Sequence, residues 1–445
     1  MSSNKYCENL SGLERLKTIN VKVGEVLVGY GYPIRVQTMA TTSTINTIAT
    51  VEQCLKSVNA GAELFRITAP SLKDAKNLAD IKRELLKRGI TTPIVADIHF
   101  NPEVALEAAL YVDKVRINPG NYADPRAKFN TFEYTDEEYN DELKKVEQLF
   151  LPLLDLCNKR GVALRIGVNH GSLSDRIMSR YGDTPQGMVE SAMEFLRICQ
   201  RQKFQNVVVS MKASNTRVMV QSTRLLVNQM MNEGMVYPLH LGVTEAGEGE
   251  DGRIKSAVGI GTLLADGIGD TIRVSLTEDP ECEIPVAKKL VSYFENRKTK
   301  PVIPIITELP YDPFSYNRRK TYSIGIIGGN NPPIVIADFS NLAAITHNNL
   351  QDYGWRYDES KQSWVKGNQA VDFILSKPET IKNLQNPSTP PIIQLIDSLT
   401  NVDKTATIPS FIKINCSELN IDFINQIKEF KNLALILETT NSNGY

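Results

Sequence analysis

The sequence lacks the features of a membrane or secreted protein. No stretch approaches the 18 uninterrupted apolar residues of a spanning helix, and the N-terminal segment MSSNKYCENLSGLERLKTINVKVGEVLVG has no apolar core flanked by basic residues. Six cysteines are scattered without short spacings, which excludes a disulfide framework and a metal knuckle. They are Cys7, Cys54, Cys157, Cys199, Cys282 and Cys416. These absences predict a protein of the reducing cytoplasm that does not bind membranes.

An excess of charge of either sign is also absent. The chain carries 50 Lys and Arg against 51 Asp and Glu, for a net charge of −1. This balance argues against the broad basic surface of a protein that binds nucleic acid. Any cluster of cations must therefore be local, and local clusters are more informative about function. The 445 residues are too many for one ordinary core and predict two domains.

Short β-branched and apolar runs alternate with stretches at helical spacing from about residue 34 to residue 297, and we assign residues 1–297 to one domain that binds substrate and carries the catalytic residues. The strand candidates span 34–41, 64–70, 93–100, 114–121, 162–172, 206–214, 238–247 and 270–280. Eight such units are the number that closes a parallel (β/α)8 TIM barrel. A doubly wound open sheet shares the alternation, but it is disfavoured by the even spacing and by the absence of a Gly-rich turn after the first strand. We therefore predict an α/β barrel.

The alternation of strand-like and helical segments ends at residues 298–310, where prolines indicate a linker. Beyond it, over residues 311–445, the runs YSIGIIGG, PPIVIADFS, PIIQLIDS, SFIKINCS and LALILETT read as buried strands. The last run is followed by only a few residues, where a βα repeat would normally continue. We interpret this region as a partial second α/β domain.

Five of the expected barrel strands carry a cation in their apolar body. In a barrel, side chains alternate between the interior and the helices, and active sites lie at the C-terminal strand ends. Burying five positive charges together is costly unless an anion neutralises them, and a diphosphate suits the planar fork of Arg and the point charge of Lys. The alternative for any one cation is an ion pair in the barrel core. The cations are Arg66, Arg116, Arg165, Lys212 and Arg273, and the small groups two residues further on are Thr68, Asn118, Gly167, Ser214 and Ser275, with Asn169 after Gly167.

Carboxylates are few at the same strand ends. Glu245 ends the seventh strand and could donate a proton once substrate phosphate offsets the cations; its alternative role is to pair with Arg273 or Lys212. Asp97 fits a residue that orients an arginine or a substrate hydroxyl. No His-x-His or His-x3-His pair exists, so we expect no metal site in this chain.

Several strings are highly specific together: VRINPGN, RIGVNHGSLSDRI, VVSMKASN and HLGVTEAGEGEDGRIKSAVGIGTLLADGIGDTIRVSLTEDP. Over residues 10–297 the chain resembles the 4-hydroxy-3-methylbut-2-enyl diphosphate synthase family of the non-mevalonate isoprenoid pathway. The region after residue 300 resembles the insert domain of the large plant and Bacteroidetes members. The resemblance implies an oxidoreductase that opens the ring of 2-C-methyl-D-erythritol 2,4-cyclodiphosphate with two electrons.

The resemblance also implies roles for residues and cofactors. It places the diphosphate on Arg66, Arg116, Arg165, Asn169, Lys212, Arg273 and Ser275, and the acidic catalytic role on Glu245. It implies a [4Fe–4S] cluster held by three Cys and one Glu in a C-terminal domain, a motif that none of the six cysteines fits. Ferredoxin or flavodoxin would supply electrons, and a homodimer is a possible assembly. The run QTMATTSTIN departs from the family's usual first loop.

The leading hypothesis is that this chain holds the substrate barrel and part of the insert of such a synthase, and binds the cyclic diphosphate without completing the reduction. One alternative is a non-catalytic module that binds anions or partner subunits. Another is a cluster-free barrel enzyme of the pterin-synthase kind, which acts on a similar anionic substrate.

Overall fold

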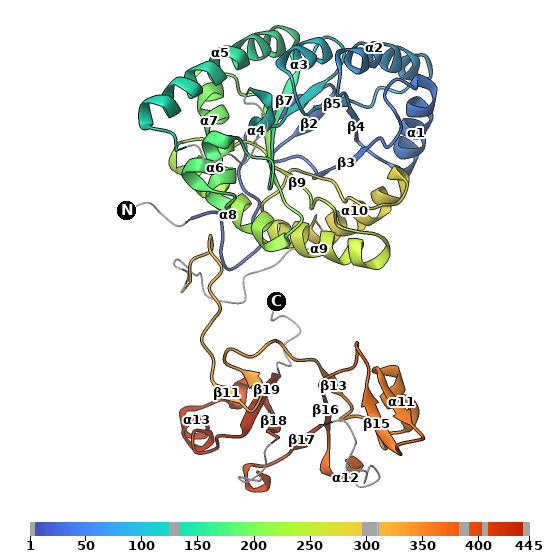
Figure 1. Ribbon diagram of the computed structural model, residues 1–445, viewed down its shortest axis with the longest axis vertical. Helices are drawn as coiled ribbons and strands as arrows, with labels where there is room; N and C mark the ends of the chain where they lie inside the picture. The colour runs from blue at the N-terminus through green and yellow to red at the C-terminus, as the bar shows by residue number, and fades with distance from the viewer. Residues whose placement is uncertain are drawn as a thin grey trace. The chain divides into compact units, whose positions relative to one another are not determined.

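The computed structural model describes residues 5–123, 133–295, 309, 311–381, 391–402 and 408–438. The chain divides into two compact units, Met1–Tyr316 and Asn317–Tyr445. Both units contain a parallel sheet with helices (Figure 1). Among the described residues, every helix is too short or too polar to traverse a lipid bilayer.

The boundary between the units falls later than residue 311. The linker predicted at residues 298–310 lies outside the described residues, apart from Leu309. Leu309 and Phe314 pack against the core of the first unit, and the Phe314 ring meets that of Tyr6 at a centroid distance of 6.0 Å. These contacts hold the chain to the barrel as far as Phe314.

The first unit is a barrel of eight parallel strands, as predicted. The strands are β3 (Arg35–Met39), β4 (Leu64–Thr68), β5 (Ile94–Ile98), β6 (Lys114–Ile117), β7 (Ala163–Asn169), β8 (Val207–Lys212), β9 (His240–Leu241) and β10 (Thr271–Ile272). Their order is β8-β7-β6-β5-β4-β3-β10-β9, and a parallel bridge between Val209 and Leu239 joins the two ends. This closure excludes the doubly wound open sheet.

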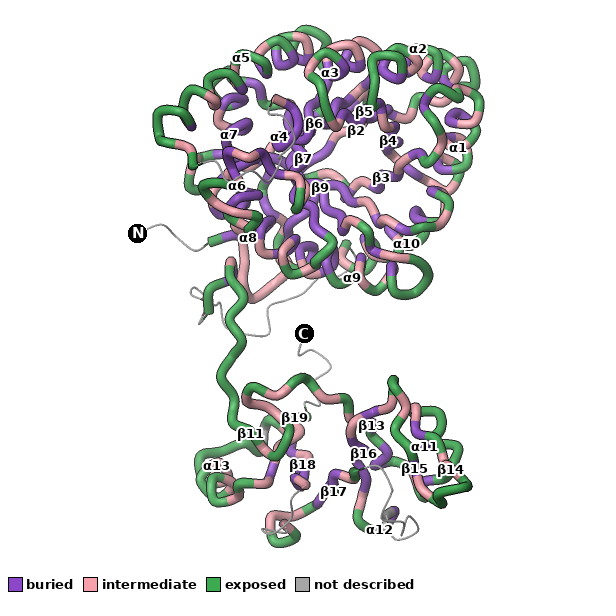
Figure 2. The backbone as a smooth tube through the Cα atoms, in the orientation of Figure 1, coloured by how far each residue is buried: buried purple, intermediate pink, exposed green. Residues whose placement is uncertain are grey.

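Helices surround the barrel and return the chain to the start of the next strand (Figure 1). They are α1 (Thr47–Ala60), α2 (Leu72–Lys87), α3 (Pro102–Ala108), α4 (Pro119–Tyr122), α5 (Asp136–Arg160), α6 (Asp175–Tyr181), α7 (Pro185–Arg201), α8 (Thr216–Asn232), α9 (Gly249–Ala265) and α10 (Pro280–Glu295). Side-chain caps fix several helix starts: Ser71 accepts from the amide of Asp74, and Thr135 forms a capping box with Glu138. Apolar side chains between strands and helices form the main core, which appears as the buried ring in Figure 2.

A hairpin closes the N-terminal end of the barrel. It consists of β1 (Val21–Val23) and β2 (Val26–Val28). Its valines form one buried cluster with the first inward residues of four strands: Leu64, Val95, Ala163 and Val208. We call this cluster the apolar floor. It leaves the C-terminal strand ends as the mouth of the barrel.

The second unit contains a five-stranded parallel sheet in the order β13-β16-β17-β18-β19. Its strands are β13 (Ile336–Asp338), β16 (Phe373–Ser376), β17 (Ile392–Ile396), β18 (Ser410–Asn415) and β19 (Leu433–Glu438); its helices are α11 (His347–Asp352), α12 (Pro378–Ile381) and α13 (Ile421–Ile427). A hairpin of β14 (Trp355–Asp358) and β15 (Ser363–Lys366) packs beside α11. The run YSIGIIGG is not a buried strand, because the chain turns at Gly325, which has a positive φ, and forms the small hairpin β11 (Ser323–Ile324) and β12 (Ile327–Gly328).

Candidate anion-binding site

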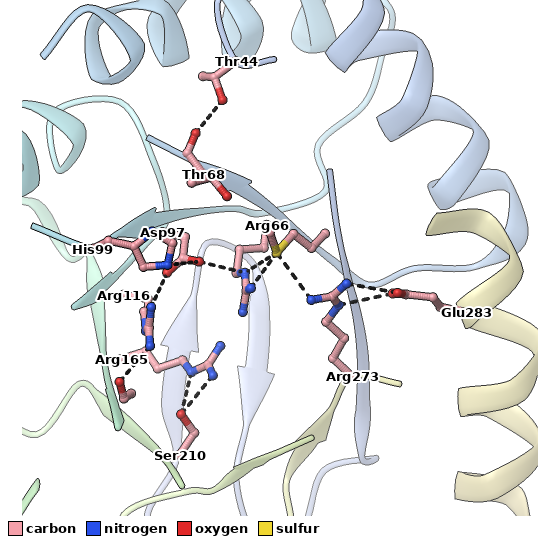
Figure 3. Close-up of polar contacts among 12 residues, drawn as sticks. Thr44, Arg66, Thr68, Asp97, His99, Arg116, Arg165, Ser210, Arg273 and Glu283 are labelled. Atoms are coloured by element: carbon pink, nitrogen blue, oxygen red, sulfur yellow. Dashed lines mark hydrogen bonds and ion pairs between the residues drawn. The ribbon is translucent and has the colours of Figure 1, made fainter. Parts of the chain in front are cut away.

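The strand register brings Asp97 and two of the predicted cations side by side in the barrel. Asp97 lies beside Arg116, and Arg116 lies beside Arg165, on three consecutive strands. On the other side of β5, Arg66 lies beside Met39 of β3. Figure 3 shows Arg66 and Arg116 joined to Asp97, with Arg165 below Arg116 and Arg273 beside Glu283.

Asp97 connects two of these arginines. Its Oδ1 accepts from Arg116 Nη1 at 2.9 Å, and its Oδ2 lies 3.3 Å from Arg66 Nε (Figure 3). His99 Nε2 is 3.6 Å from the same Oδ2. Burial alone would raise the pKa of Asp97, but Arg66 and Arg116 outweigh it and hold that pKa far below its usual range. Asp97 is therefore an ionised group that orients arginines.

Arg273 has a carboxylate partner that the sequence did not indicate. Glu283 of α10 is buried and accepts from Arg273 Nη2 at 3.0 Å and from Nε at 3.2 Å. Glu283 Oε2 also accepts from Thr38 Oγ1 at 2.8 Å. Because Glu283 fills this role, the alternative in which Glu245 pairs with Arg273 is wrong.

The thioether of Met39 lies between two guanidinium groups. Arg66 Nε approaches Met39 Sδ at 3.0 Å, and Arg273 Nη1 approaches the same sulfur at 3.4 Å. Sulfur is a weak acceptor compared with an anionic oxygen. Two arginines therefore direct N–H groups at Met39 Sδ, and this sulfur is a poor substitute for an anionic oxygen.

Arg165 and Lys212 have no carboxylate partner among the described residues. Arg165 is fully buried, and its Nε and Nη2 donate to Ser210 Oγ at 3.0 Å and 2.9 Å, while its Nη1 has no partner. Lys212 is 4% exposed, and burial, followed by Arg165 and other cations, lowers its pKa well below the ordinary lysine value. The described part of the protein therefore offers no carboxylate to balance a positive charge on either side chain.

A sixth cation, Lys114, was missed by the sequence interpretation. It precedes Arg116 by two residues on β6, so both side chains face the interior. Its side chain is 0% exposed and its Nζ has no hydrogen-bond partner among the described residues. The spacing of two within KVRINPGN was the signal that would have found it. The interior thus holds six cations and, among described residues, only Asp97 and Glu283 as carboxylates that pair with them.

Two glycines leave room for these side chains. A Cβ on Gly167 would lie 2.6 Å from Arg116 Nε, and a Cβ on Gly242 would lie 2.8 Å from Lys212 Nζ. Arg116 Nη2 also donates to the Gly167 carbonyl at 2.8 Å. The interior is packed so closely around the cations that a methyl group at either position would displace them.

The predicted polar groups lie at the strand ends with different exposure. Asn118 is buried and donates to Ser172 Oγ at 3.0 Å; Ser172 Oγ also accepts from Asn121 at 2.8 Å, which ties the loops after β6 and β7 together. Asn169 and Ser275 are half-buried, and Ser214 is exposed. Asn118 is therefore committed to loop structure, whereas Asn169 and Ser275 are partly accessible.

Glu245 lies in the loop between β9 and α9 and is exposed. Its backbone has a φ of 52°, in the left-handed region, and its carbonyl oxygen accepts from Lys255 Nζ at 3.4 Å. Among the described residues, its carboxylate contacts none of the six cations. The structure therefore brings Asp97 into the cation cluster and leaves Glu245 on the rim.

The fold and site define an α/β barrel protein with a cation-lined mouth. The family model described as "GcpE TIM-barrel domain" matches residues 18–288. The chain belongs to this family, whose curated members are named 4-hydroxy-3-methylbut-2-en-1-yl diphosphate synthase.

Three relatives illustrate the range of the similarity. The synthase (flavodoxin) of Bacteroides fragilis is 56% identical over 76% of this chain and 54% of its own length. The synthase (flavodoxin) of Parabacteroides distasonis is 46% identical over 97% of this chain and 69% of its own length. The chloroplastic synthase (ferredoxin) of Arabidopsis thaliana is 56% identical over 65% of this chain and 39% of its own length. The chain thus spans about half the length of several of the curated relatives it matches.

Proposed function

We propose that this chain is the substrate-binding part of an isoprenoid-pathway oxidoreductase, and that its barrel mouth binds 2-C-methyl-D-erythritol 2,4-cyclodiphosphate. The observation that carries the proposal is the excess of buried cations over carboxylates inside the barrel. Such an excess is costly in the free protein and is relieved by a polyanion. The relatives' names supply the product, 4-hydroxy-3-methylbut-2-en-1-yl diphosphate. Two-electron ring opening of the cyclic compound is the reaction that the family resemblance implies.

The role that we propose for each residue follows from whether it has a carboxylate partner in the structure. Arg165 and Lys212, which have no carboxylate partner among the described residues, would bind phosphate oxygens directly. Arg66 and Arg116, oriented by Asp97, and Arg273, oriented by Glu283, would complete the cradle. Asn169 and Ser275 would add hydrogen bonds at the rim, with Asn118 and Ser214 beside them. Glu245 would donate a proton from its loop.

An iron–sulfur cluster is the cofactor that the family implies, and flavodoxin or ferredoxin is the implied electron donor. The described residues do not fit a cluster, because they contain no group of three or more His, Cys, Asp or Glu side chains that could hold a metal. Four of the six cysteines are buried in the barrel unit. We therefore derive no step through the cluster and confine the proposal to substrate binding. A homodimer and a cytoplasmic location stay predictions.

Calorimetric titration with the cyclodiphosphate tests the proposal. Arg165→Ala should weaken binding by about 10- to 150-fold, because a hydrogen bond to a charged group contributes about 1.5–3 kcal/mol. The matched control is Arg197→Ala: Arg197 lies on α7 and is already paired with Glu190 and Glu233. Its loss should leave the dissociation constant unchanged. Folded wild-type protein that binds no cyclodiphosphate at low salt would refute the proposal.

A further inference from the structure

A layer of polar side chains lies level with the strand residues of the apolar floor, deep in the barrel. We call Gln37, Lys114 and His240 the inner polar layer; each is 0% exposed. Lys114 lies beside Val95 and Ala163 of the apolar floor in the strand register, and Gln37 lies beside Leu64. Arg116 is two residues above Lys114, which places it about 6–7 Å nearer the mouth. The inner polar layer therefore lies among apolar strand residues of the floor and deeper in the barrel than Arg116.

The polar atoms of this layer lack partners in the described part of the protein. Lys114 Nζ, His240 Nε2 and both amide atoms of Gln37 make no hydrogen bond. Within the described ranges, the side chains of the layer make one hydrogen bond, between His240 Nδ1 and Thr271 Oγ1 at 3.3 Å. Buried polar groups are nearly always hydrogen-bonded, so such a group of orphaned atoms is a departure from ordinary core structure. Nothing in the described protein stabilises a charge on Lys114.

The charged groups that face Lys114 are cations. They are Arg165 of β7 and Arg66 of β4, and together with burial, which has the larger effect, they lower the pKa of Lys114 to about 7. His240 of β9 also faces this region; burial, followed by Arg165, Lys212 and Lys114, holds its pKa well below the ordinary value, so it is neutral. Guanidinium groups keep their protons in proteins. Of Lys114, His240 and the two arginines that face them, Lys114 is therefore the residue that can change its charge near neutral pH.

We propose that Lys114 takes up a proton when an anionic ligand binds at the mouth above it. This inference rests on the proposed function, because it requires a dianion beside Arg116 and Arg165. The step forms one N–H bond on the neutral Lys114 amine, the proton comes from the solvent buffer, and no electron moves. Binding of the ligand and protonation of the inner polar layer then reinforce each other, since linkage acts equally in both directions.

The size of the effect follows from Coulomb's law. Two negative charges about 10 Å away, at an effective dielectric constant of about 20, strengthen proton binding by roughly a hundredfold. An amine that is mostly neutral at about pH 8 in the free protein then becomes mostly protonated in the complex, which corresponds to uptake of about 0.5–1 proton per ligand. The cyclodiphosphate has only diester-type acidic groups, so it does not titrate in this range itself.

Calorimetry in several buffers measures this proton. The cyclodiphosphate is titrated into the whole chain at about pH 8 in Tris, Tricine and HEPES, and the binding enthalpy is plotted against the ionisation enthalpy of each buffer. The slope should give an uptake of about 0.5–1 proton for wild type and close to zero for Lys114→Met. Lys413→Met, in the second unit, should keep the wild-type slope because Lys413 pairs with Asp338 and Glu438.

The outcomes separate the two proposals. Binding without any dependence on the buffer overturns the role of Lys114 and leaves the proposed function standing. An unchanged slope in Lys114→Met assigns the proton to another group, such as Lys212, and also overturns it. If the ligand binds in none of the buffers, both the proposed function and the role of Lys114 are refuted. If Lys114→Met does not fold, Lys114→Arg, which keeps a permanent charge, should abolish the slope in the same way.

Discussion

Both units of this protein contain a parallel sheet, but they treat buried positive charge differently. In the sheet of the second unit, the Lys413 ammonium lies 3.6 Å from Asp338, which ends β13, and 3.4 Å from Glu438, which ends β19. In the barrel, Arg165, Lys212 and Lys114 have no carboxylate partner among the described residues. The second unit neutralises its cation at the surface, whereas the barrel keeps an excess of cations inside.

This difference distinguishes a structural charge from one held for a ligand. A lysine between two exposed carboxylates needs nothing more, and its pair contributes little to stability. A buried arginine without a carboxylate costs free energy that only a bound anion recovers. The barrel bears that cost in its interior, where Arg165 and Lys212 are buried. Whether each buried cation has a carboxylate partner is thus a better guide to the site than the net charge of −1 for the chain.

Asp97→Asn should lower the stability of the barrel more than any other single change at the site. It removes the carboxylate that pairs with Arg66 and Arg116 and leaves both cations buried, so the free energy of unfolding of the barrel should fall by about 3–5 kcal/mol. Urea unfolding followed by far-UV circular dichroism measures this loss. Tryptophan emission should not change its midpoint, because both tryptophans, Trp355 and Trp364, lie in the second unit.

Asp338→Asn is the matched change in the second unit. Its side chain is 48% exposed, so the loss of stability should stay below about 1 kcal/mol, read from the tryptophan emission. Equal losses for Asp97→Asn and Asp338→Asn would show that the two units hold their charges in the same way.

Lys114→Met should stabilise the free barrel by an amount that depends on pH. The folded-state pKa of about 7 lies below the unfolded value of about 10.4. Between these values the unfolded chain binds a proton that the folded chain does not, so the stability of wild type falls as the pH falls. The advantage of Lys114→Met should grow to a few kcal/mol between about pH 10 and pH 7 and be constant below it. Urea unfolding of both proteins across this range measures the difference, with Lys413→Met as the control. A difference independent of pH would contradict the account of Lys114.

The barrel could be predicted from sequence because each strand run is short, apolar and followed by helical spacing. The two-residue strands β9 and β10 are shorter than the predicted 238–247 and 270–280, since the chain leaves the ladder as it enters the mouth loops. In the second unit, the hairpin of Trp355–Asp358 and Ser363–Lys366 and the strand Phe373–Ser376 were not predicted. Their runs are brief and have no clear alternation, so the period-two signal is weak.

The site was partly predictable for a related reason. Arg66, Arg116, Arg165 and Arg273 follow from strand alternation, which fixes the face on which each side chain lies. Glu283 lies on a helix ten residues after its partner, and its contact with Arg273 depends on how α10 packs against the barrel. Strand periodicity carries no information about such a contact. Met39 was missed because an apolar residue in an apolar strand gives no signal that two guanidinium groups meet its sulfur.

Glu245→Gln should have the smallest effect on binding and therefore sharpens the distinction between holding the ligand and acting on it. The Glu245 carboxylate is exposed and, among the described residues, contacts none of the six cations, so the dissociation constant for the cyclodiphosphate should change by less than about threefold, under roughly 0.7 kcal/mol. Calorimetric titration of Glu245→Gln and of Arg165→Ala compares the two dissociation constants for residues of the same unit. A loss for Glu245→Gln as large as that for Arg165→Ala would mean that the β9–α9 loop closes over the ligand and that Glu245 belongs to the binding surface. Retained binding leaves Glu245 free to serve as the proton donor at the rim, while the unpaired cations below hold the phosphates.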